Sequence, residues 1–324
     1  MMRALLLSAA ALIAAPVAAQ DVAITNARLV IGDGSAPIEG GTVVVRGGKI
    51  VAAGAGVAVP AGIERVDAGG HWVTPGIVAA FSRVGLVEVD AVQGSNDRSA
   101  RRSRFSAGID IAPALNPMGS PVAVNRAAGV TRAIVAPGDS SGLFAGQGAV
   151  VDLGDDNDMV TRPRALQFIE FGEGGSSNAG GSRAATFLMF REQLLAARSY
   201  ARNPATLAEW GSDALIQRAD ADALVRVING TTPLFVRVDR AADILNVLKL
   251  KGEFPALKLV LVGATEGWLV ARDIAAAKVP VLVSPLSDLP ASFERLGATQ
   301  SNAGRLEAAG VDVSVGVFDD DDAH

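Results

Sequence analysis

The sequence contains no cysteine and only two histidines, His71 and His324, among its 324 residues. The absence of cysteine excludes disulfide bonds and thiolate metal sites. Catalytic zinc sites usually contain several histidine ligands, and two histidines are too few for a typical site of this kind. We interpret His71 as a surface or packing residue, because it lies just before the turn at Pro75-Gly76 and outside the strand predicted from residue 77. The composition therefore argues against an ordinary zinc hydrolase.

Basic residues are also in deficit, with 29 Lys and Arg against 34 Asp and Glu and a net charge of -5. This balance argues against a nucleic-acid-binding surface. One dense basic patch exists, formed by Arg98, Arg101, Arg102 and Arg104. It is either a solvated loop or a recognition site for an anionic ligand or partner.

A long hydrophobic run is missing after the N-terminus, so we expect no membrane span. The first 19 residues have Arg3, an apolar run from Ala4 to Ala15 and the small residues Val17-Ala18-Ala19. This pattern is typical of a secretory signal peptide, and the run is too short to span a bilayer. We expect cleavage after residue 19 and a periplasmic or secreted mature protein.

Residues 20–74 form the next predicted segment. Apolar and polar residues alternate in residues 22–31, 41–46 and 49–52, with Gly32, Gly34, Gly47 and Gly48 between the runs. Period-2 alternation interrupted by glycine is typical of short strands joined by tight turns. We therefore predict a small antiparallel β unit.

From residue 75 to residue 324 the pattern changes to strands that alternate with helices. Predicted strands are residues 77–86, 131–136, 233–238, 258–262, 280–283 and 312–317. Predicted helices are residues 122–128, with Ser120 as the capping residue, and 182–202, 241–253, 266–277 and 301–309. This repetition predicts an α/β fold with a parallel barrel. Residues 155–181 are predicted to be a loop, and strands between residues 155 and 230 are not placed.

The residues at the boundary between the two patterns carry a family resemblance. The stretch Trp72-Val-Thr-Pro-Gly-Ile-Val-Ala-Ala-Phe-Ser-Arg83 resembles the entry to the barrel of the amidohydrolase superfamily, especially its imidazolonepropionase-like members. Further matching segments are Val236 to Ile244 and Thr265-Glu266-Gly267. The resemblance covers nearly the whole mature chain. It implies an amidohydrolase-like (β/α)8 TIM barrel preceded by a small β-sandwich segment. In the family, strands after the barrel complete this sandwich, so we expect the C-terminal part to be missing.

The same resemblance implies a zinc or other divalent metal site, but its ligand positions are substituted. The first strand of the family carries Asp-x-His-x-His, where this chain has Ala79, Phe81 and Arg83. Arg237 and Asp239 replace the two histidines expected near the fifth strand. Gly263 and Phe318 stand in the places of the later His and Asp ligands. We therefore expect no metal cofactor.

Three interpretations of the substituted site remain open. The charges could fill the former metal cavity as internal salt bridges. Arg83 and Arg237 could bind a small anion, because paired guanidinium groups suit carboxylates and phosphates. Asp239, Glu266 and Asp319 could hold a hard cation or act as an acid–base pair.

The corresponding functions are also three. The activity implied by the resemblance is hydrolysis of non-peptide carbon–nitrogen bonds in cyclic amides, in an altered or inactive form. The alternatives are a non-catalytic protein that binds a small anionic molecule and a subunit that pairs with an intact paralogue. A homo-oligomer is a further expectation.

Overall fold

The computed structural model describes residues 21–138, 140–211 and 214–316. These residues form two compact units, one up to Pro75 and one from Gly76 onward. The predicted signal peptide and the candidate site residues Phe318 and Asp319 lie outside the described residues. No helix in the described ranges is long and apolar enough to cross a membrane.

The first unit is built on one five-stranded sheet. Its strands are β1 (Val22–Leu29), β2 (Ile38–Arg46), β3 (Lys49–Gly54), β4 (Glu64–Asp67) and β5 (Trp72–Val73). Strands β1, β2 and β3 pair in antiparallel fashion, and Gly47 and Gly48 make the β2–β3 turn with positive φ. However, β4 and β5 both pair parallel to β1, so the prediction of a purely antiparallel unit was wrong. The β-sandwich remains a prediction, because it requires a second sheet.

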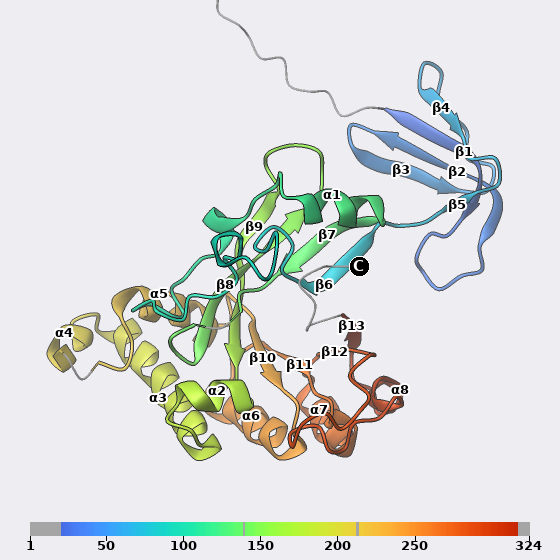
Figure 1. Cartoon of the computed structure of the whole chain (residues 1–324). Helices are drawn as coiled ribbons and strands as arrows, with labels where there is room; N and C mark the ends of the chain where they lie inside the picture. Colours follow the sequence, from blue (N-terminus) through green and yellow to red (C-terminus); the bar gives the residue numbers. More distant parts are fainter. Residues whose placement is uncertain (1–20, 139, 212–213, 317–324) are drawn as a thin grey trace, which may run out of the picture. The chain divides into compact units, whose positions relative to one another are not determined.

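The second unit contains an eight-stranded sheet that forms a nearly closed barrel (Figure 1). The strands follow the order β13-β12-β11-β10-β9-β8-β7-β6. They are β6 (Ile77–Ser82), β7 (Val130–Val135), β8 (Phe144–Asp152), β9 (Val160–Glu170), β10 (Leu234–Val238), β11 (Leu259–Gly263), β12 (Val281–Val283) and β13 (Val313–Val315). Only β8 runs antiparallel to its neighbours, and the other pairs are parallel. The predicted α/β fold and an eight-stranded barrel are thus present, but the antiparallel β8 departs from the all-parallel barrel that the sequence predicted.

Helices accompany the strands of this second unit. The α-helices are α1 (Ser120–Ala127), α2 (Glu173–Asn178), α3 (Arg183–Arg202), α4 (Thr206–Trp210), α5 (Arg218–Ile228), α6 (Ala241–Glu253), α7 (Ala271–Ala277) and α8 (Asn302–Ala308). The 3-10 turns are η1 (Gln93–Ser95), η2 (Ala112–Ala114) and η4 (Gly267–Val270). Helix α3 ends at its predicted residue and begins one residue later than predicted, because Ser182 is its N-cap and accepts a hydrogen bond from the Ala185 N–H.

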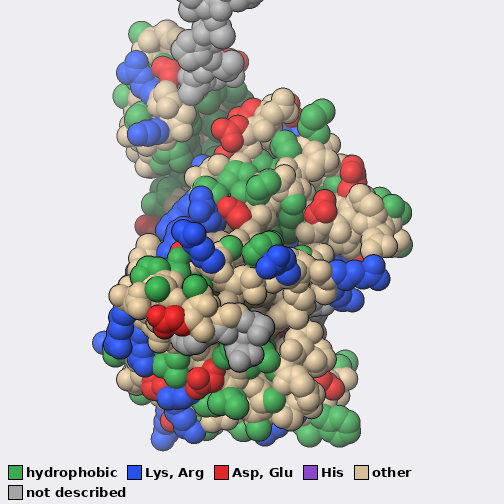
Figure 2. All heavy atoms as spheres, turned by 90° about the vertical axis from the view of Figure 1, so that its left-hand side faces the viewer, with side chains coloured by type: hydrophobic (Ala, Val, Ile, Leu, Met, Phe, Trp, Pro, Cys, Tyr) green, Lys and Arg blue, Asp and Glu red, His purple; other side chains and the backbone are tan. Residues whose placement is uncertain are grey.

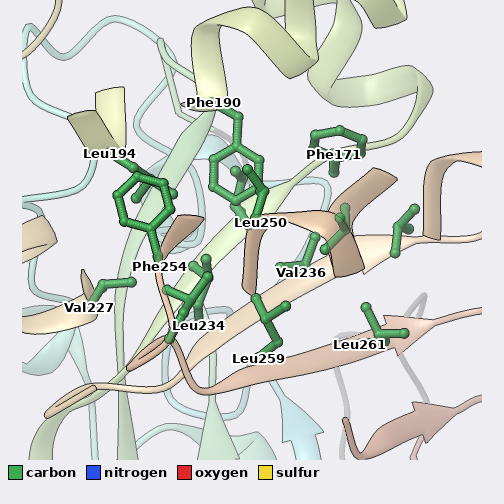
Figure 3. Close-up of a cluster of buried hydrophobic side chains, with 14 of the residues drawn as sticks. Phe171, Phe190, Leu194, Val227, Leu234, Val236, Leu250, Phe254, Leu259 and Leu261 are labelled. Carbon is green, nitrogen blue, oxygen red and sulfur yellow. The ribbon is translucent and has the colours of Figure 1, made fainter. Parts of the chain in front are cut away.

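Successive side chains along a strand point to opposite faces of the sheet, so the barrel has two hydrophobic cores. One lies between the sheet and the helices, and the other lies inside the barrel. Leu234, Val236 and Val238 of β10 lie in a large cluster between the sheet and the helices, together with Phe190 of α3 (Figure 3). Phe235, between them, belongs to a second cluster inside the barrel. We call this second set the inner cluster; it comprises Phe81, Ala136, Ala145, Leu166, Phe168, Phe235, Val262 and Leu282. Burial of each large apolar side chain contributes roughly 1.5–3 kcal/mol, so both clusters hold the barrel together.

Strand β9 and helix α1 correct two details of the sequence prediction. Residues 155–181 were predicted to be a loop, but they contain β9 and α2. The first half of β9 carries Arg162 and Arg164 in exposed positions, so its sequence lacks the apolar run of a buried strand. Helix α1 starts at Ser120, with Gly119 as its N-cap, so Ser120 does not act as the cap.

Candidate functional site

The residues at the substituted metal positions lie at one edge of the barrel. Every strand except β8 runs in the same direction, so their C-terminal ends meet at this edge, which we call the carboxyl rim. Catalytic groups of (β/α)8 enzymes lie at this edge. Phe81 and Arg83 are at the end of β6, Arg237 is near the end of β10, and Gly263 ends β11. The structure therefore places these four residues at the same edge.

Phe81 fills space below the rim. It is only 2% exposed and packs against Phe168 with ring centroids 5.4 Å apart. Arg83 follows the end of β6, and its guanidinium lies beside Gly138, where an added Cβ would meet Nη1 at 3.3 Å. The aromatic side chain thus belongs to the inner cluster rather than to an open binding site.

Arg237 shares the inward-facing side of its strand with Phe235, because residues two apart project to the same face. Its partner in the register of the adjacent β9 strand is Glu170, which is likewise two residues after the inward Phe168. An arginine and a glutamate therefore occupy neighbouring inward positions near the carboxyl rim. Anion binding by Arg83 and Arg237 remains a prediction.

Asp239 is buried at the start of the loop that follows β10. It is 5% exposed, and its Oδ1 accepts hydrogen bonds from the Thr265 hydroxyl at 2.6 Å and the Thr265 N–H at 3.2 Å. Its Oδ2 forms an ion pair with Arg295, whose Nε lies 3.0 Å away. Both carboxylate oxygens are thus engaged by groups of the protein. Arg295 was missed in the sequence analysis, because no motif surrounds it and only the fold brings it to Asp239.

The Asp239 carboxylate also occupies the space beside Gly263. A Cβ built on Gly263 would lie 2.5 Å from Asp239 Oδ1, and Gly263 has a φ of +88°. Both the short distance and the positive φ disfavour any residue with a side chain. The resemblance implies a metal-ligating histidine at this position, and the Asp239 carboxylate occupies the room that such a side chain would need.

Glu266 is the second buried carboxylate and is 8% exposed. Its Oε2 accepts a hydrogen bond from the Ala241 N–H at 3.0 Å, at the start of α6, and its Oε1 accepts one from the Gly297 N–H at 2.9 Å. The Trp268 Nε1 donates to the Gly297 carbonyl at 2.7 Å. Glu266 therefore joins the start of α6 to the loop that follows β12.

These contacts converge on residues 294–297 of that loop. Glu294 accepts from Arg183 Nη2 at 2.7 Å, Arg295 pairs with Asp239, and Gly297 is bonded to Glu266. The acidic residues at the substituted site thus anchor a loop to the carboxyl rim. Of the three interpretations from the sequence, internal salt bridges describe the geometry at Asp239.

The donor set does not fit the divalent metal of the family. A divalent ion needs several unprotonated nitrogen or oxygen ligands directed at one point. Here Asp239 already accepts three hydrogen bonds, one of them from a cationic arginine, and Glu266 accepts two backbone N–H groups. Within the described ranges, no three His, Asp or Glu side chains are grouped so that they could hold a metal ion. An ion bound at Asp239 would have to displace Arg295.

The four arginines of the predicted basic patch lie in the loop after β6, and Arg98 and Arg104 contact different partners. Arg98 pairs with Asp90 at 3.1 Å, and Arg104 donates to Gln217 at 3.2 Å. A hollow of about 610 Å³ is lined by residues 98–103 together with Asp90. On the face shown in Figure 2, Lys and Arg side chains gather in small separate groups among acidic and hydrophobic ones.

Residues 138–142 match the Gly-x-Ser-x-Gly spacing of serine hydrolases around Ser140. In those enzymes the serine is exposed on a turn between a strand and a helix. Here Ser140 is 3% exposed, precedes strand β8 and donates its hydroxyl to the Phe144 carbonyl at 2.5 Å. This geometry does not present a nucleophile.

Comparisons with known proteins agree with the barrel. No protein-family model matches the sequence, and no curated protein matches it. An amidohydrolase from Thermotoga maritima MSB8 matches the structure with a TM-score of 0.80 and 24% identity, over 91% of this chain and 78% of the other.

Two further solved structures are similar at lower scores. A prolidase complexed with N-methylphosphonate-L-proline has a TM-score of 0.48 and 12% identity, over 92% of this chain and 78% of the other. An N-isopropylammelide isopropylaminohydrolase from Burkholderia multivorans ATCC 17616 has a TM-score of 0.45 and 13% identity, over 92% and 74%. The likeness to the Thermotoga structure shows that this chain shares the α/β barrel fold of that protein.

Proposed function

We propose that this protein is a non-hydrolytic relative of the amidohydrolases, which uses their barrel without metal-assisted cleavage of carbon–nitrogen bonds. The observation that carries the proposal is the Asp239–Arg295 pair at 3.0 Å. It puts a cation of the protein itself on the carboxylate that stands at a metal-ligand position. The space for the next ligand, at Gly263, is filled by the same carboxylate.

Hydrolysis in this fold needs an activated water. A divalent metal lowers the pKa of its bound water to about 7 and polarises the scissile carbonyl. Without it, a carboxylate would have to act as the general base. Both candidates already accept hydrogen bonds that stabilise the ionised carboxylate, Asp239 from Thr265 and Arg295 and Glu266 from two backbone N–H groups, which makes each a weaker base toward water. The arrangement therefore supports binding and structure better than turnover.

The direct test is an assay of purified full-length protein against a panel of lactams, N-acyl amino acids and cyclic ureas. The assay would be run without added metal and with zinc or manganese, beside an active amidohydrolase as the positive control. We expect no product above the uncatalysed rate in any condition. Turnover that depends on Asp239, measured by its loss in Asp239→Asn, would overturn the proposal.

Hydrolysis of non-peptide carbon–nitrogen bonds, in cyclic amides as the imidazolonepropionase-like resemblance implies, is the second candidate. The TM-score of 0.80 to an amidohydrolase favours it. Under this alternative, a chelator would abolish turnover and added metal would restore it. The pairing of this chain with an intact paralogue is a third possibility, tested by whether such a relative co-purifies with it.

A further inference from the structure

A cavity of about 710 Å³ lies outside the barrel, where helices α3 and α6 begin. Its walls come from separate elements: Phe171 follows β9, Arg183 and Phe187 belong to α3, and Asp243 and Asn246 belong to α6. Arg240, the N-cap of α6, also lines the cavity. The cavity combines two aromatic side chains, two arginines and one buried carboxylate, which is a different chemistry from the closed contacts at Asp239.

The two arginines of this cavity are neutralised to different degrees. Arg183 binds two carboxylates, with Nε 3.1 Å from Asp243 Oδ2 and Nη2 2.7 Å from Glu294 Oε1. Arg240 has one ion pair within the described part of the chain, to the same Asp243 oxygen at 3.9 Å, which is beyond hydrogen-bonding distance. Asp243 is thus shared between the two arginines. Arg240 does not form a hydrogen bond to it, so the N–H groups of the Arg240 guanidinium can bind another anion.

A second polar donor faces the same cavity. The Asn246 Oδ1 accepts a hydrogen bond from Lys249 Nζ at 3.0 Å, which leaves the Asn246 amide N–H₂ to donate. Arg240 and Asn246 together offer a planar guanidinium fork and an amide donor, a combination that suits a carboxylate. Phe187 is partly exposed and Phe171 is buried, so an apolar surface lies beside these donors.

We propose that this cavity binds a small organic carboxylate with an apolar or aromatic group, with the carboxylate on Arg240 and Asn246 and the apolar group against Phe187. The site is independent of the barrel chemistry, because none of these residues contributes to the contacts of Asp239 or Glu266. Inorganic phosphate carries charge without an apolar group and binds more weakly at such a site.

The test is isothermal titration calorimetry of the full-length protein with 3-phenylpropionate, its neutral analogue 3-phenylpropionamide, and inorganic phosphate. We expect one saturable site for the carboxylate and an affinity about tenfold lower for the amide, because a charge-assisted pair contributes roughly 1.5–3 kcal/mol. Arg240→Gln should weaken carboxylate binding by about tenfold, and Phe187→Ala should weaken it by about fivefold through lost apolar contact.

Two further variants keep the test decisive. Asn246→Asp replaces the second donor by a negative charge that repels a carboxylate. It should weaken binding while Arg240 itself is not substituted. Arg272→Gln removes an exposed arginine of α7 and should leave the affinity unchanged. The proposal is overturned by the absence of saturable binding to the unmodified protein, by equal affinity for the amide, or by an Arg240→Gln variant that binds as tightly as the unmodified protein. The outcomes with 3-phenylpropionate do not depend on whether the protein hydrolyses amides.

Discussion

Asp239 and Asp243 lie four residues apart at the carboxyl rim and are equally buried, at 5% and 4% exposure. Their surroundings differ. Asp239 accepts two hydrogen bonds from Thr265 and forms an ion pair with Arg295, and all three contacts are within hydrogen-bonding distance. Asp243 lies beside a cavity, with Arg183 at 3.1 Å and Arg240 at 3.9 Å.

The comparison shows that a buried aspartate can have two different roles in the same protein. A carboxylate whose oxygens are all occupied by fixed donors holds the structure together and offers nothing to a ligand. The Asp243 carboxylate is hydrogen-bonded by Arg183 but not by Arg240, so the Arg240 guanidinium can still donate hydrogen bonds into the cavity. The three variants below test this distinction, beginning with the largest expected effect.

Asp239→Ala should destabilise the fold most. It would leave Arg295 as a mostly buried cation without its carboxylate and remove the acceptor of the Thr265 hydroxyl, and breaking a buried pair on one side costs about 3–5 kcal/mol. Chemical denaturation would measure this loss. The control is Asp312→Ala, at an exposed position, which should change the free energy of unfolding by no more than about 0.5 kcal/mol. Equal stability of the two variants would contradict the role assigned to Asp239.

Gly263→Ala should come second. The added Cβ would meet Asp239 Oδ1 at 2.5 Å in a backbone conformation with φ of +88°, and strain of this kind costs about 1–3 kcal/mol. Gly252→Ala is the matched control, because Gly252 lies within α6 with open space around it, and alanine is the better helix former there.

The loss at Gly263 should shrink when Asp239 is also replaced by Ala, since the carboxylate that the new Cβ meets is then gone. A double-mutant cycle measures this coupling. Strictly additive losses would show that the carboxylate does not occupy the space beside Gly263.

Asp243→Asn should have the smallest effect, seen in the pH dependence of stability. Burial raises the pKa of Asp243 above its usual 3.8, and the facing Glu294 adds to this, while Arg240 and Arg183 oppose it. Between 3.8 and the raised pKa the folded protein binds more protons than the unfolded chain, so the unmodified protein loses stability as pH rises through this window.

The Asp243→Asn variant lacks this contribution. We therefore expect the free energy of unfolding of the variant, relative to that of the unmodified protein, to increase as pH rises from 3.8. Urea denaturation of both proteins at a series of pH values measures the difference. A difference that moves in the opposite direction would mean that the arginines, rather than burial, dominate at Asp243.

The regular half of the barrel was predictable from sequence. Strands β10 to β13 are short apolar runs separated by helices of ordinary length, so periodicity alone locates them. Strand β9 was missed, because Arg162, Pro163 and Arg164 lie in its exposed first half and hide the pattern. The parallel pairing of β4 and β5 with β1 was also missed, since alternation identifies a strand but not its partner.

The candidate site was predictable only in part. The motifs that carry the resemblance predicted the positions of Asp239 and Gly263, and the sequence has no histidine at either position. The partner of Asp239 was not visible, because Arg295 is 56 residues away in a loop without a motif. The donors around Asp243 come from two separate segments, at the starts of α3 and α6, so the cavity that they line appears only when the chain is folded.

The most direct test of the central claim is the metal content of the purified full-length protein after equilibrium dialysis against micromolar zinc or manganese, measured by inductively coupled plasma mass spectrometry. Asp239→Ala serves as the matched control. We predict no stoichiometric metal in the unmodified protein and no difference between the two proteins. One metal ion per chain in the unmodified protein, lost in Asp239→Ala, would contradict the account.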